Sequence, residues 1–248
     1  LSFGGSTTVS VTANGGTAPY TGTGTFTASA GTHTYVVTDA NGCSVTVTIT
    51  LTEPGQLVVT TTQGTILCNG GTTTVNIVAS GGTAPYTGIG TFTASAGTQT
   101  YLVSDANNVT YVATVTITEP SALVTNANQG TILCNGGTTT VNVTATGGTS
   151  PYTGTGIYTL SAGPYSYTVT DANGCSSVVS GTIIQPSQLT ANATAGTILS
   201  FGGSTTVNIT ATGGTAPYTG VGTFTASAGT HTYVVTDANG CSVIVTVT

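Results

Sequence analysis

Cysteine is the residue type of this chain with the most definite chemistry, because thiols pair as disulfides in an oxidising compartment. The chain has 5 cysteines in 248 residues, so at least one thiol lacks a partner within the chain. The cysteines occupy two positions in a sequence unit that repeats every 66 residues. The first position holds Ser2, Cys68, Cys134 and Ser200, and the second holds Cys43, Val109, Cys175 and Cys241.

The phase of the repeat predicts how the cysteines pair. Pairing within a unit would join cysteine to serine or valine in three of the four units. Pairing the first position of one unit with the second position of the next never joins cysteine to another residue type. We therefore predict the disulfides Cys68–Cys175 and Cys134–Cys241. Cys43 is left over, and we expect it to pair with a cysteine of a preceding repeat or of a neighbouring chain.

Imidazole and carboxylate side chains are the other groups that could do chemistry. His33 and His231 are replaced by Gln99 and Tyr165 in the other units, so a solvent-facing strand position explains them better than catalysis or metal binding. An aspartate starts the same turn in every unit, where it normally caps its own backbone, and calcium requires more carboxylates than one turn offers. These turn residues are Asp39, Asp105, Asp171 and Asp237.

The remaining carboxylates and the overall charge exclude further functions. Glu53 and Glu119 precede proline, but the third equivalent residue is Gln185, which disfavours a calcium clamp. No nucleophile has a base and an orienting acid nearby, so we predict no enzyme, no catalytic residue, no cofactor and no metal site. The chain has no Lys or Arg and a formal net charge of −6. Because nothing can neutralise phosphates, we expect no nucleic-acid partner and no membrane insertion.

Four asparagines begin Asn-x-Ser/Thr sequences and are candidate glycosylation sites. The Thr-rich composition also permits O-linked sugar. Either modification would cover strand edges that lack the lysines which usually block edge pairing. The four asparagines are Asn108, Asn142, Asn192 and Asn208.

The elements that position these residues form an array. A Pro-Tyr motif ends at Tyr20, Tyr86, Tyr152 and Tyr218, a spacing of 66 residues. A fixed period over the whole chain predicts tandem copies of one small unit. Proline, which cannot donate to a strand ladder, marks the joints between the units. The predicted domains are repeat 1 (residues 1–52, without its first strand), repeat 2 (53–118), repeat 3 (119–184) and repeat 4 (185–248).

Alternation of apolar residues with threonine dominates each unit, and no stretch has helical spacing. In residues 44–50, for example, Val45, Val47 and Ile49 fall on one face. Repeat 2 has Asn108 where the other hairpin turns have glycine, and asparagine tolerates a left-handed conformation. Six or seven short strands in 66 residues predict an all-β chain, a tandem array of small immunoglobulin-like β-sandwich domains. In repeat 2 we expect strands at residues 57–62, 72–79, 85–88, 91–94, 98–104 and 110–118.

This arrangement agrees with the predicted disulfides. If the chain crosses each sandwich from one pole to the other, the first and last strands run in the same direction. The loop after the first strand then faces the closing hairpin of the next domain. The two cysteine positions lie in this loop and after this hairpin.

Four landmarks occur in order and resemble one known repeat family. They are Gly-Gly-Thr-Ala-Pro-Tyr, Ser-Ala-Gly-Thr before a tyrosine-bearing strand, Thr-Asp-Ala-Asn-Gly-Cys, and Ile-Thr-Glu-Pro. Together they look like the SprB-type repeat of large cell-surface adhesins from gliding bacteria. The resemblance implies an extracellular β-sandwich array, exported across the cell envelope, in proteins that contact surfaces or carbohydrate.

The sequence therefore indicates a secreted, cell-surface protein with a structural task. We expect a subunit or stalk segment of an extracellular bacterial filament or adhesin, stiffened by inter-domain disulfides. Its partners would be other copies of itself or flanking repeats, because repeat 1 starts without its first strand and a neighbouring segment would supply it. The alternative is an adhesin module that binds surface glycans through the loops around the Pro-Tyr motifs.

Overall fold

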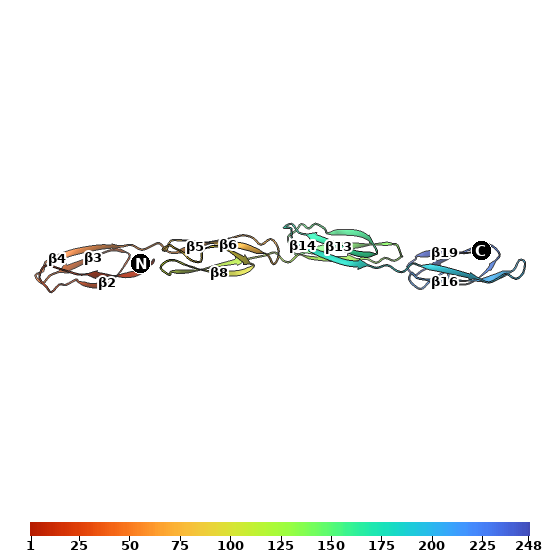
Figure 1. Ribbon diagram of the computed structural model, residues 1–248, viewed down its shortest axis with the longest axis horizontal. Coiled ribbons are helices and arrows are strands. Elements are labelled where there is room, and N and C mark those ends of the chain that lie inside the picture. Colours follow the sequence, from red (N-terminus) through yellow and green to blue (C-terminus); the bar gives the residue numbers. More distant parts are fainter. The chain divides into compact units, whose positions relative to one another are not determined.

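The computed structural model describes all 248 residues of the chain. The fold is all-β, with 19 strands and no helix, and every strand pairing is antiparallel. Two compact units, Leu1–Glu119 and Pro120–Thr248, divide the chain. Each unit contains two of the 66-residue repeats, and Figure 1 labels the strands along the sequence.

The first unit contains nine strands. Residues 1–52 form β1 (Ser6–Val11), β2 (Gly24–Ser29), β3 (Gly31–Thr38) and β4 (Ser44–Leu51). Residues 53–118 form β5 (Val58–Gln63), β6 (Thr72–Ser80), β7 (Gly90–Ser95), β8 (Gly97–Ser104) and β9 (Thr110–Ile117).

The second unit contains ten strands in the order seen for β5 to β9. Residues 119–184 form β10 (Val124–Gln129), β11 (Thr138–Thr146), β12 (Gly156–Ser161), β13 (Gly163–Thr170) and β14 (Ser176–Ile183). Residues 185–248 form β15 (Thr190–Ala195), β16 (Ser204–Thr212), β17 (Gly222–Ser227), β18 (His231–Thr236) and β19 (Ser242–Val247).

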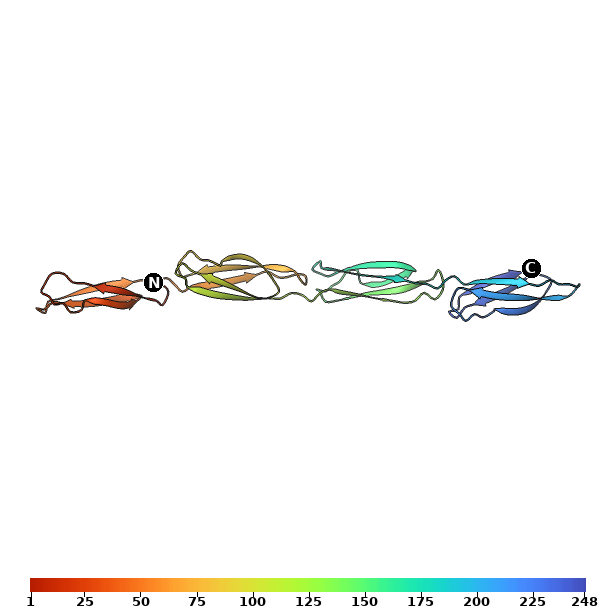
Figure 2. The same ribbon diagram turned by 60° about the horizontal axis from the view of Figure 1, so that its bottom comes forward.

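Repeat 2 illustrates how the strands are arranged. A three-stranded sheet has the order β5-β6-β7, and β8 pairs with β9 in a two-stranded hairpin. Figures 1 and 2 show β5 and β6 in one layer and β8 in the other. The first strand also reaches the last, since Gln63 Nε2 of β5 donates to the main-chain oxygen of Thr116 in β9 at 3.3 Å. The two layers therefore enclose the inward side chains of the alternating pattern.

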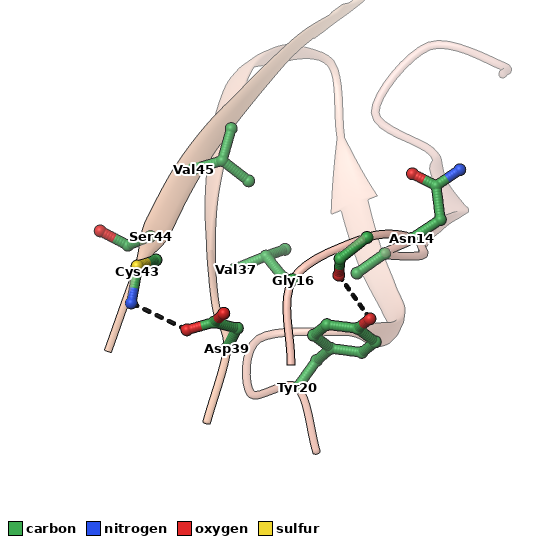
Figure 3. A pocket seen from close by; sticks show the side chains of 10 residues that line it. Asn14, Gly16, Tyr20, Val37, Asp39, Cys43, Ser44 and Val45 are labelled. Atoms are coloured by element: carbon green, nitrogen blue, oxygen red, sulfur yellow. Dashed lines mark hydrogen bonds between the residues drawn. The ribbon is translucent and has the colours of Figure 1, made fainter. Parts of the chain in front are cut away.

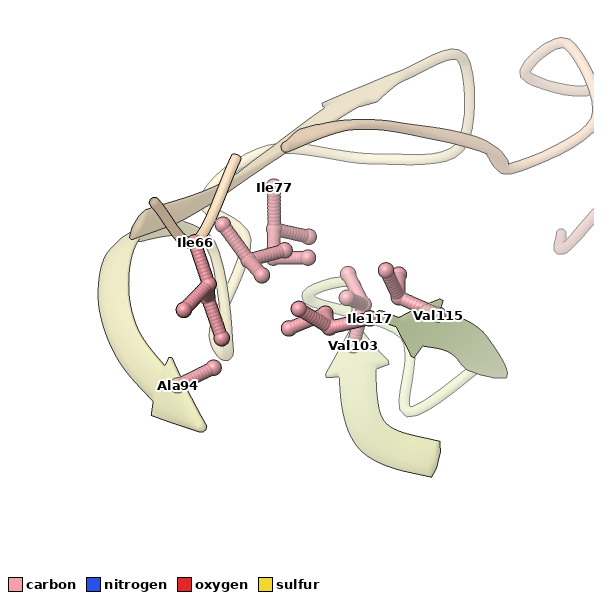
Figure 4. Close-up of a cluster of buried hydrophobic side chains, with 7 residues drawn as sticks. Ile66, Ile77, Ala94, Val103, Val115 and Ile117 are labelled. Atoms are coloured by element: carbon pink, nitrogen blue, oxygen red, sulfur yellow. The ribbon is translucent and has the colours of Figure 1, made fainter. Parts of the chain in front are cut away.

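Inward-facing valines and isoleucines form the core of this repeat (Figure 4). Val75 and Ile77 alternate with exposed threonine and asparagine along β6 and are 0% and 1% exposed. Full burial of such a side chain contributes roughly 1.5–3 kcal/mol. The other buried members of the cluster are Ile66, Ala94, Val103, Val115 and Ile117. Each of the other three repeats has a separate cluster of its own.

The structure bears out most of the strand pattern but not the strand expected at residues 85–88. Only Thr87 pairs there, through an isolated bridge to Ser104. Pro85 has no N–H to donate, and Gly88 turns the chain away with a φ of 77°. A Cβ on Gly88 would overlap the main-chain oxygen of Leu102, so this turn also requires glycine. The left-handed conformation expected of Asn108 is confirmed, with a φ of 60°.

Candidate functional site

A disulfide in the second unit joins repeat 3 to repeat 4. Cys134 lies between β10 and β11, and Cys241 follows the turn between β18 and β19. Their Cα atoms are 5.7 Å apart, and 107 residues separate them in sequence. Both cysteines sit in tight turns, because Gly137 N–H donates to the Cys134 oxygen at 3.0 Å and Asp237 N–H to the Cys241 oxygen at 2.9 Å. This is the pair that the repeat phase predicts.

Hydrogen bonds hold the loop of Cys134 to the segment between the two repeats. The side-chain amide of Asn135 donates to the main-chain oxygen of Pro186 at 3.0 Å. The N–H of Gly136 donates to Oε1 of Gln185 at 2.7 Å. The Gln185-Pro186 joint therefore connects the two repeats through the main chain and also through hydrogen bonds to the loop of Cys134.

The closing hairpin of repeat 4 contacts the same loop through Asn239. Its Nδ2 donates to the main-chain oxygen of Leu133 at 3.0 Å. In the first unit, Nδ2 of Asn107 makes the equivalent bond to Leu1 at 3.4 Å, although this joint has no cysteines. The hydrogen bond between loop and hairpin thus recurs with and without a disulfide.

Sequence reasoning missed the role of the residue before each joint proline. Oε2 of Glu119 accepts from the N–H of Gly70 at 2.6 Å, and Oε2 of Glu53 accepts from Gly4 at 2.7 Å. Because the amide oxygen of Gln185 makes the same bond, the position requires a hydrogen-bond acceptor rather than a charge. The only sequence signal was a constant spacing of 49 residues between acceptor and glycine.

The three other cysteines differ in whether they form a disulfide. Cys68 and Cys175 are both disulfide-bonded, and that they pair with each other stays a prediction. Cys43 is free and exposed. Disulfide-bonded cysteines indicate an oxidising compartment.

The turn aspartates cap backbone groups. Oδ1 of Asp237 accepts from the N–H groups of Asn239 and Cys241, each at 2.9 Å, and Oδ2 accepts from the N–H of Thr215 at 2.9 Å. Both oxygens are used within the repeat, and the carboxylate fixes the hairpin that carries Cys241. This geometry matches the capping interpretation of the sequence.

These bonds change the acidity of the aspartates. For Asp105, Asp171 and Asp237, burial is the largest single effect and raises the pKa, but the backbone N–H donors together outweigh it and lower the pKa. For Asp39 the hydrogen bond from Thr17 is the largest cause of a lowered pKa, and burial matters less. Figure 3 shows Asp39 accepting a hydrogen bond from the N–H of Cys43.

The histidines bond to the backbone of their own repeat. Nε2 of His33 lies 2.8 Å from the main-chain oxygen of Ser29, and Nε2 of His231 lies 2.9 Å from that of Ser227. Gln99 makes the equivalent bond with its side-chain amide in repeat 2. No group of three His, Cys, Asp or Glu side chains that could hold a metal ion occurs in the structure.

The Pro-Tyr tyrosines use their hydroxyl groups internally. In each repeat the tyrosine hydroxyl donates to the main-chain oxygen five residues earlier, and the ring is half-buried. Tyrosine corners of β-sandwiches tie a strand to the chain upstream in this way. The bonds are Tyr20 to Gly15 and Tyr86 to Gly81, both at 2.5 Å, and Tyr152 to Gly147 and Tyr218 to Gly213, both at 2.6 Å.

The candidate glycosylation sites all lie on the surface. Asn108 is in a hairpin turn, and the other three are on strands β11, β15 and β16 with their side chains exposed. Attachment of sugar at them remains a prediction. The three strand residues are Asn142, Asn192 and Asn208.

Comparison with known proteins adds no family to this description. No protein-family model matches the chain, and no curated protein matches its sequence. The structure has no helix with the length and hydropathy needed to cross a membrane. The joint around Cys134–Cys241 is therefore the candidate functional site on its geometry alone.

Proposed function

We propose that the chain is a structural, non-enzymatic stalk segment of a secreted bacterial surface filament or adhesin. It consists of tandem immunoglobulin-like β-sandwich repeats, whose joints are reinforced by disulfides. The observation that carries the proposal is the Cys134–Cys241 disulfide, which ties the loop of one repeat to the closing hairpin of the next. The resemblance to SprB-type repeats supports a location on the cell surface.

The joint is suited to carry tension. A disulfide and the hydrogen bonds to Leu133 and Gln185 connect the two repeats beside the chain itself. A force on the two ends of the chain is shared among these links and the chain connection. Bending at the joint also requires the links to break. In the chain-entropy account, closing a loop on the order of 100 residues also stabilises the fold by up to about 4.7 kcal/mol.

Composition supports the same role. Without Lys or Arg the chain offers no site to proteases that cleave after these residues. A chain with 2% charged residues and many threonines suits a fibre covered by sugar or by other copies of the chain. The cysteines fit a protein that leaves the cytosol.

Glycan binding by the Pro-Tyr loops is the second candidate. The tyrosine rings could stack on sugars, but Tyr20, Tyr152 and Tyr218 pack against the cores of their repeats, and their hydroxyls are bonded to glycine oxygens. A corner residue used in this way favours the structural role.

Single-molecule force spectroscopy on the full chain tests the proposal. A variant with Cys43, Cys68 and Cys175 replaced by serine retains only the Cys134–Cys241 disulfide. Under oxidising conditions, unfolding should release less length than after reduction, because the bridge shields 107 residues of about 3.6 Å each, roughly 390 Å.

The control is the variant with all five cysteines replaced by serine, whose released length should not depend on reductant. Equal lengths before and after reduction in the first variant would contradict a load-bearing joint. Specific binding to a glycan array, lost when the Pro-Tyr tyrosines are changed, would favour the second candidate.

A further inference from the structure

Asparagine precedes glycine in two recurrent turns of the chain. Such a pair is chemically labile, because glycine has no side chain to hinder attack of its main-chain nitrogen on the asparagine side-chain carbonyl carbon. A bond forms between these two atoms, the side-chain nitrogen leaves as ammonia with the glycine proton, and water then opens the ring to aspartate or isoaspartate. The asparagines are Asn69 and Asn135 in the loop after the first strand, and Asn41, Asn173 and Asn239 in the closing hairpin.

The hairpin pairs are held by hydrogen bonds inside their own repeats. In repeat 3, Nδ2 of Asn173 donates to Oγ1 of Thr149 at 3.0 Å, and the N–H of Gly174 donates to the main-chain oxygen of Asp171 at 3.1 Å. The hairpins of repeats 1 and 4 have the same two bonds. The nitrogen that must leave and the nitrogen that must lose a proton to attack are therefore both restrained within the repeat.

The loop pair of repeat 3 is held from the joint instead. Nδ2 of Asn135 donates to the main-chain oxygen of Pro186 at 3.0 Å, and the N–H of Gly136 donates to Oε1 of Gln185 at 2.7 Å. The hydrogen bond that closes the loop itself joins the residues on either side of the pair, at 3.0 Å, and involves neither of the two nitrogens. Both restraints on the reaction are thus lost together if the joint opens.

The loop is otherwise open to the reaction. Asn135 is exposed, so water reaches its side chain. Gly136 has a φ of 77°, and a Cβ built on it would meet no atom within 4 Å. Once the bonds to the joint are broken, no neighbouring group hinders ring closure at this pair.

The labile pair occurs only in the loops that also contain a disulfide-bonded cysteine. Cys68 and Cys134 are both disulfide-bonded and directly precede Asn69 and Asn135. In the equivalent loops of repeats 1 and 4, serine takes the place of the cysteine and phenylalanine that of the asparagine. At the joint of repeats 3 and 4, the disulfide therefore keeps closed the contact that restrains the pair.

We propose that Asn135 is a deamidation site that the closed joint between repeats 3 and 4 suppresses and an opened joint exposes. The aspartate product only accepts hydrogen bonds, so it cannot bind the Pro186 oxygen. The isoaspartate product lengthens the main chain and moves the N–H of Gly136 away from Gln185. Deamidation thus makes a reversible opening of the joint permanent. This inference rests on the contacts of the joint and not on the stalk role.

Deamidation rates in the full chain test the proposal. The chain is kept at neutral pH and physiological temperature, and peptic peptides are analysed by mass spectrometry for conversion of amide to acid. Asn173 is the internal control, because it lies in the same repeat but is restrained within it. In Gln185→Ala, the rate at Asn135 relative to Asn173 should rise roughly five- to tenfold, as expected for loss of one hydrogen bond.

Two further variants separate the parts of the joint. Gln185→Glu retains an acceptor oxygen and should keep the rate ratio of the parent chain. The double variant Cys134→Ser with Cys241→Ser should raise the ratio, because the joint then opens more often. An unchanged ratio in Gln185→Ala or in the double variant would overturn the proposal. An equal rise at Asn135 and Asn173 would also overturn it, since that result reports unfolding of repeat 3 and not opening of the joint.

Reoxidation tests whether deamidation keeps the joint open. The variant that retains only Cys134 and Cys241 is reduced and then reoxidised, either at once or after Asn135 has been converted. The delayed sample should regain a smaller fraction of the disulfide than the immediate one. Adding Asn135→Ser, which removes the reacting amide, should restore full recovery after the same delay. Equal recovery after the delay with and without Asn135→Ser would contradict a permanent opening. The stalk proposal is tested separately, by the length released under force.

Discussion

The side-chain amide nitrogen of Asn239 lies 3.0 Å from the main-chain oxygen of Leu133, so the hairpin of repeat 4 is bonded to the loop of repeat 3 beside their disulfide. Asn107 makes the same bond to Leu1 at a joint where Ser2 and Val109 occupy the two cysteine positions. The contact is therefore hydrogen-bonded at both joints, and a disulfide reinforces it between repeats 3 and 4. Variants of Asn239 and of the two cysteines separate the contribution of the hydrogen bond from that of the disulfide.

Replacing Asn239 by alanine should lower the free energy of unfolding of the chain by about 1–2 kcal/mol. The change removes the bond to Leu133 and a second bond from Nδ2 to the hydroxyl of Thr215 at 3.0 Å. Urea unfolding followed by circular dichroism measures the effect. Asn208→Ala, on an exposed strand position, is the matched control and should change stability by less than about 0.5 kcal/mol.

Removing the Cys134–Cys241 disulfide should lower the free energy of unfolding more than Asn239→Ala does. The double variant Cys134→Ser with Cys241→Ser should lose up to about 4.7 kcal/mol of stability, because the unfolded chain regains the freedom of a long loop. The free thiol of Cys43 provides the control, since Cys43→Ser breaks no bond within the chain. Equal stability of the double variant and the control would show that the disulfide does not constrain the unfolded chain.

The residue before each joint proline should tolerate loss of its charge but not loss of its acceptor oxygen. Glu119→Gln should leave the unfolding midpoint nearly unchanged, because Gln185 makes the equivalent bond in repeat 3. Glu119→Ala should destabilise the fold by roughly 1 kcal/mol, the usual net value of one hydrogen bond. If the glutamine variant were as unstable as the alanine variant, the charge of Glu119 would matter after all.

Stability should fall at acid pH because of the turn aspartates. Their pKa values in the folded state lie below the ordinary value of 3.8, so their stabilising effect is complete above that value. As pH falls below 3.8 and through the folded pKa, the carboxylates take up protons and the stabilisation is lost. The thermal midpoint measured from pH 7 to pH 2 should therefore decrease below about pH 4.

A single-site variant assigns this effect. Asp237→Asn should have a lower thermal midpoint than the parent at pH 7, since the ionised acceptor of three backbone N–H groups is lost. Its midpoint should also change less between pH 5 and pH 2. An acid dependence identical to that of the parent would exclude Asp237 as a contributor.

Local patterns predicted the strands well where burial alternates. The strand expected at residues 98–104 is found at Gly97–Ser104, and the one at 72–79 at Thr72–Ser80. The strand expected at 85–88 failed because a positive φ at Gly88 limits pairing to a single residue. Its backbone conformation depends on the close approach of Leu102, which no local pattern contains.

The site was only partly predictable for the same reason. Repeat phase indicated the pairing of Cys134 with Cys241 because cysteine chemistry requires a matching partner. The bond from Gly70 to Glu119 joins residues whose types allow many partners, and only the fold brings them together. The period of the sequence thus shows which positions of the repeats are equivalent. Which residues form hydrogen bonds with one another can be seen only in the structure.

Disulfide mapping of the non-reduced chain tests the central claim most directly. Because trypsin has no cleavage site, the chain is digested with pepsin at acid pH, which also prevents thiol exchange, and the linked peptides are identified by mass spectrometry. We expect Cys134 linked to Cys241, and Cys68 linked to Cys175. A peptide linking Cys134 to Cys175, within one repeat, would contradict disulfide-reinforced joints.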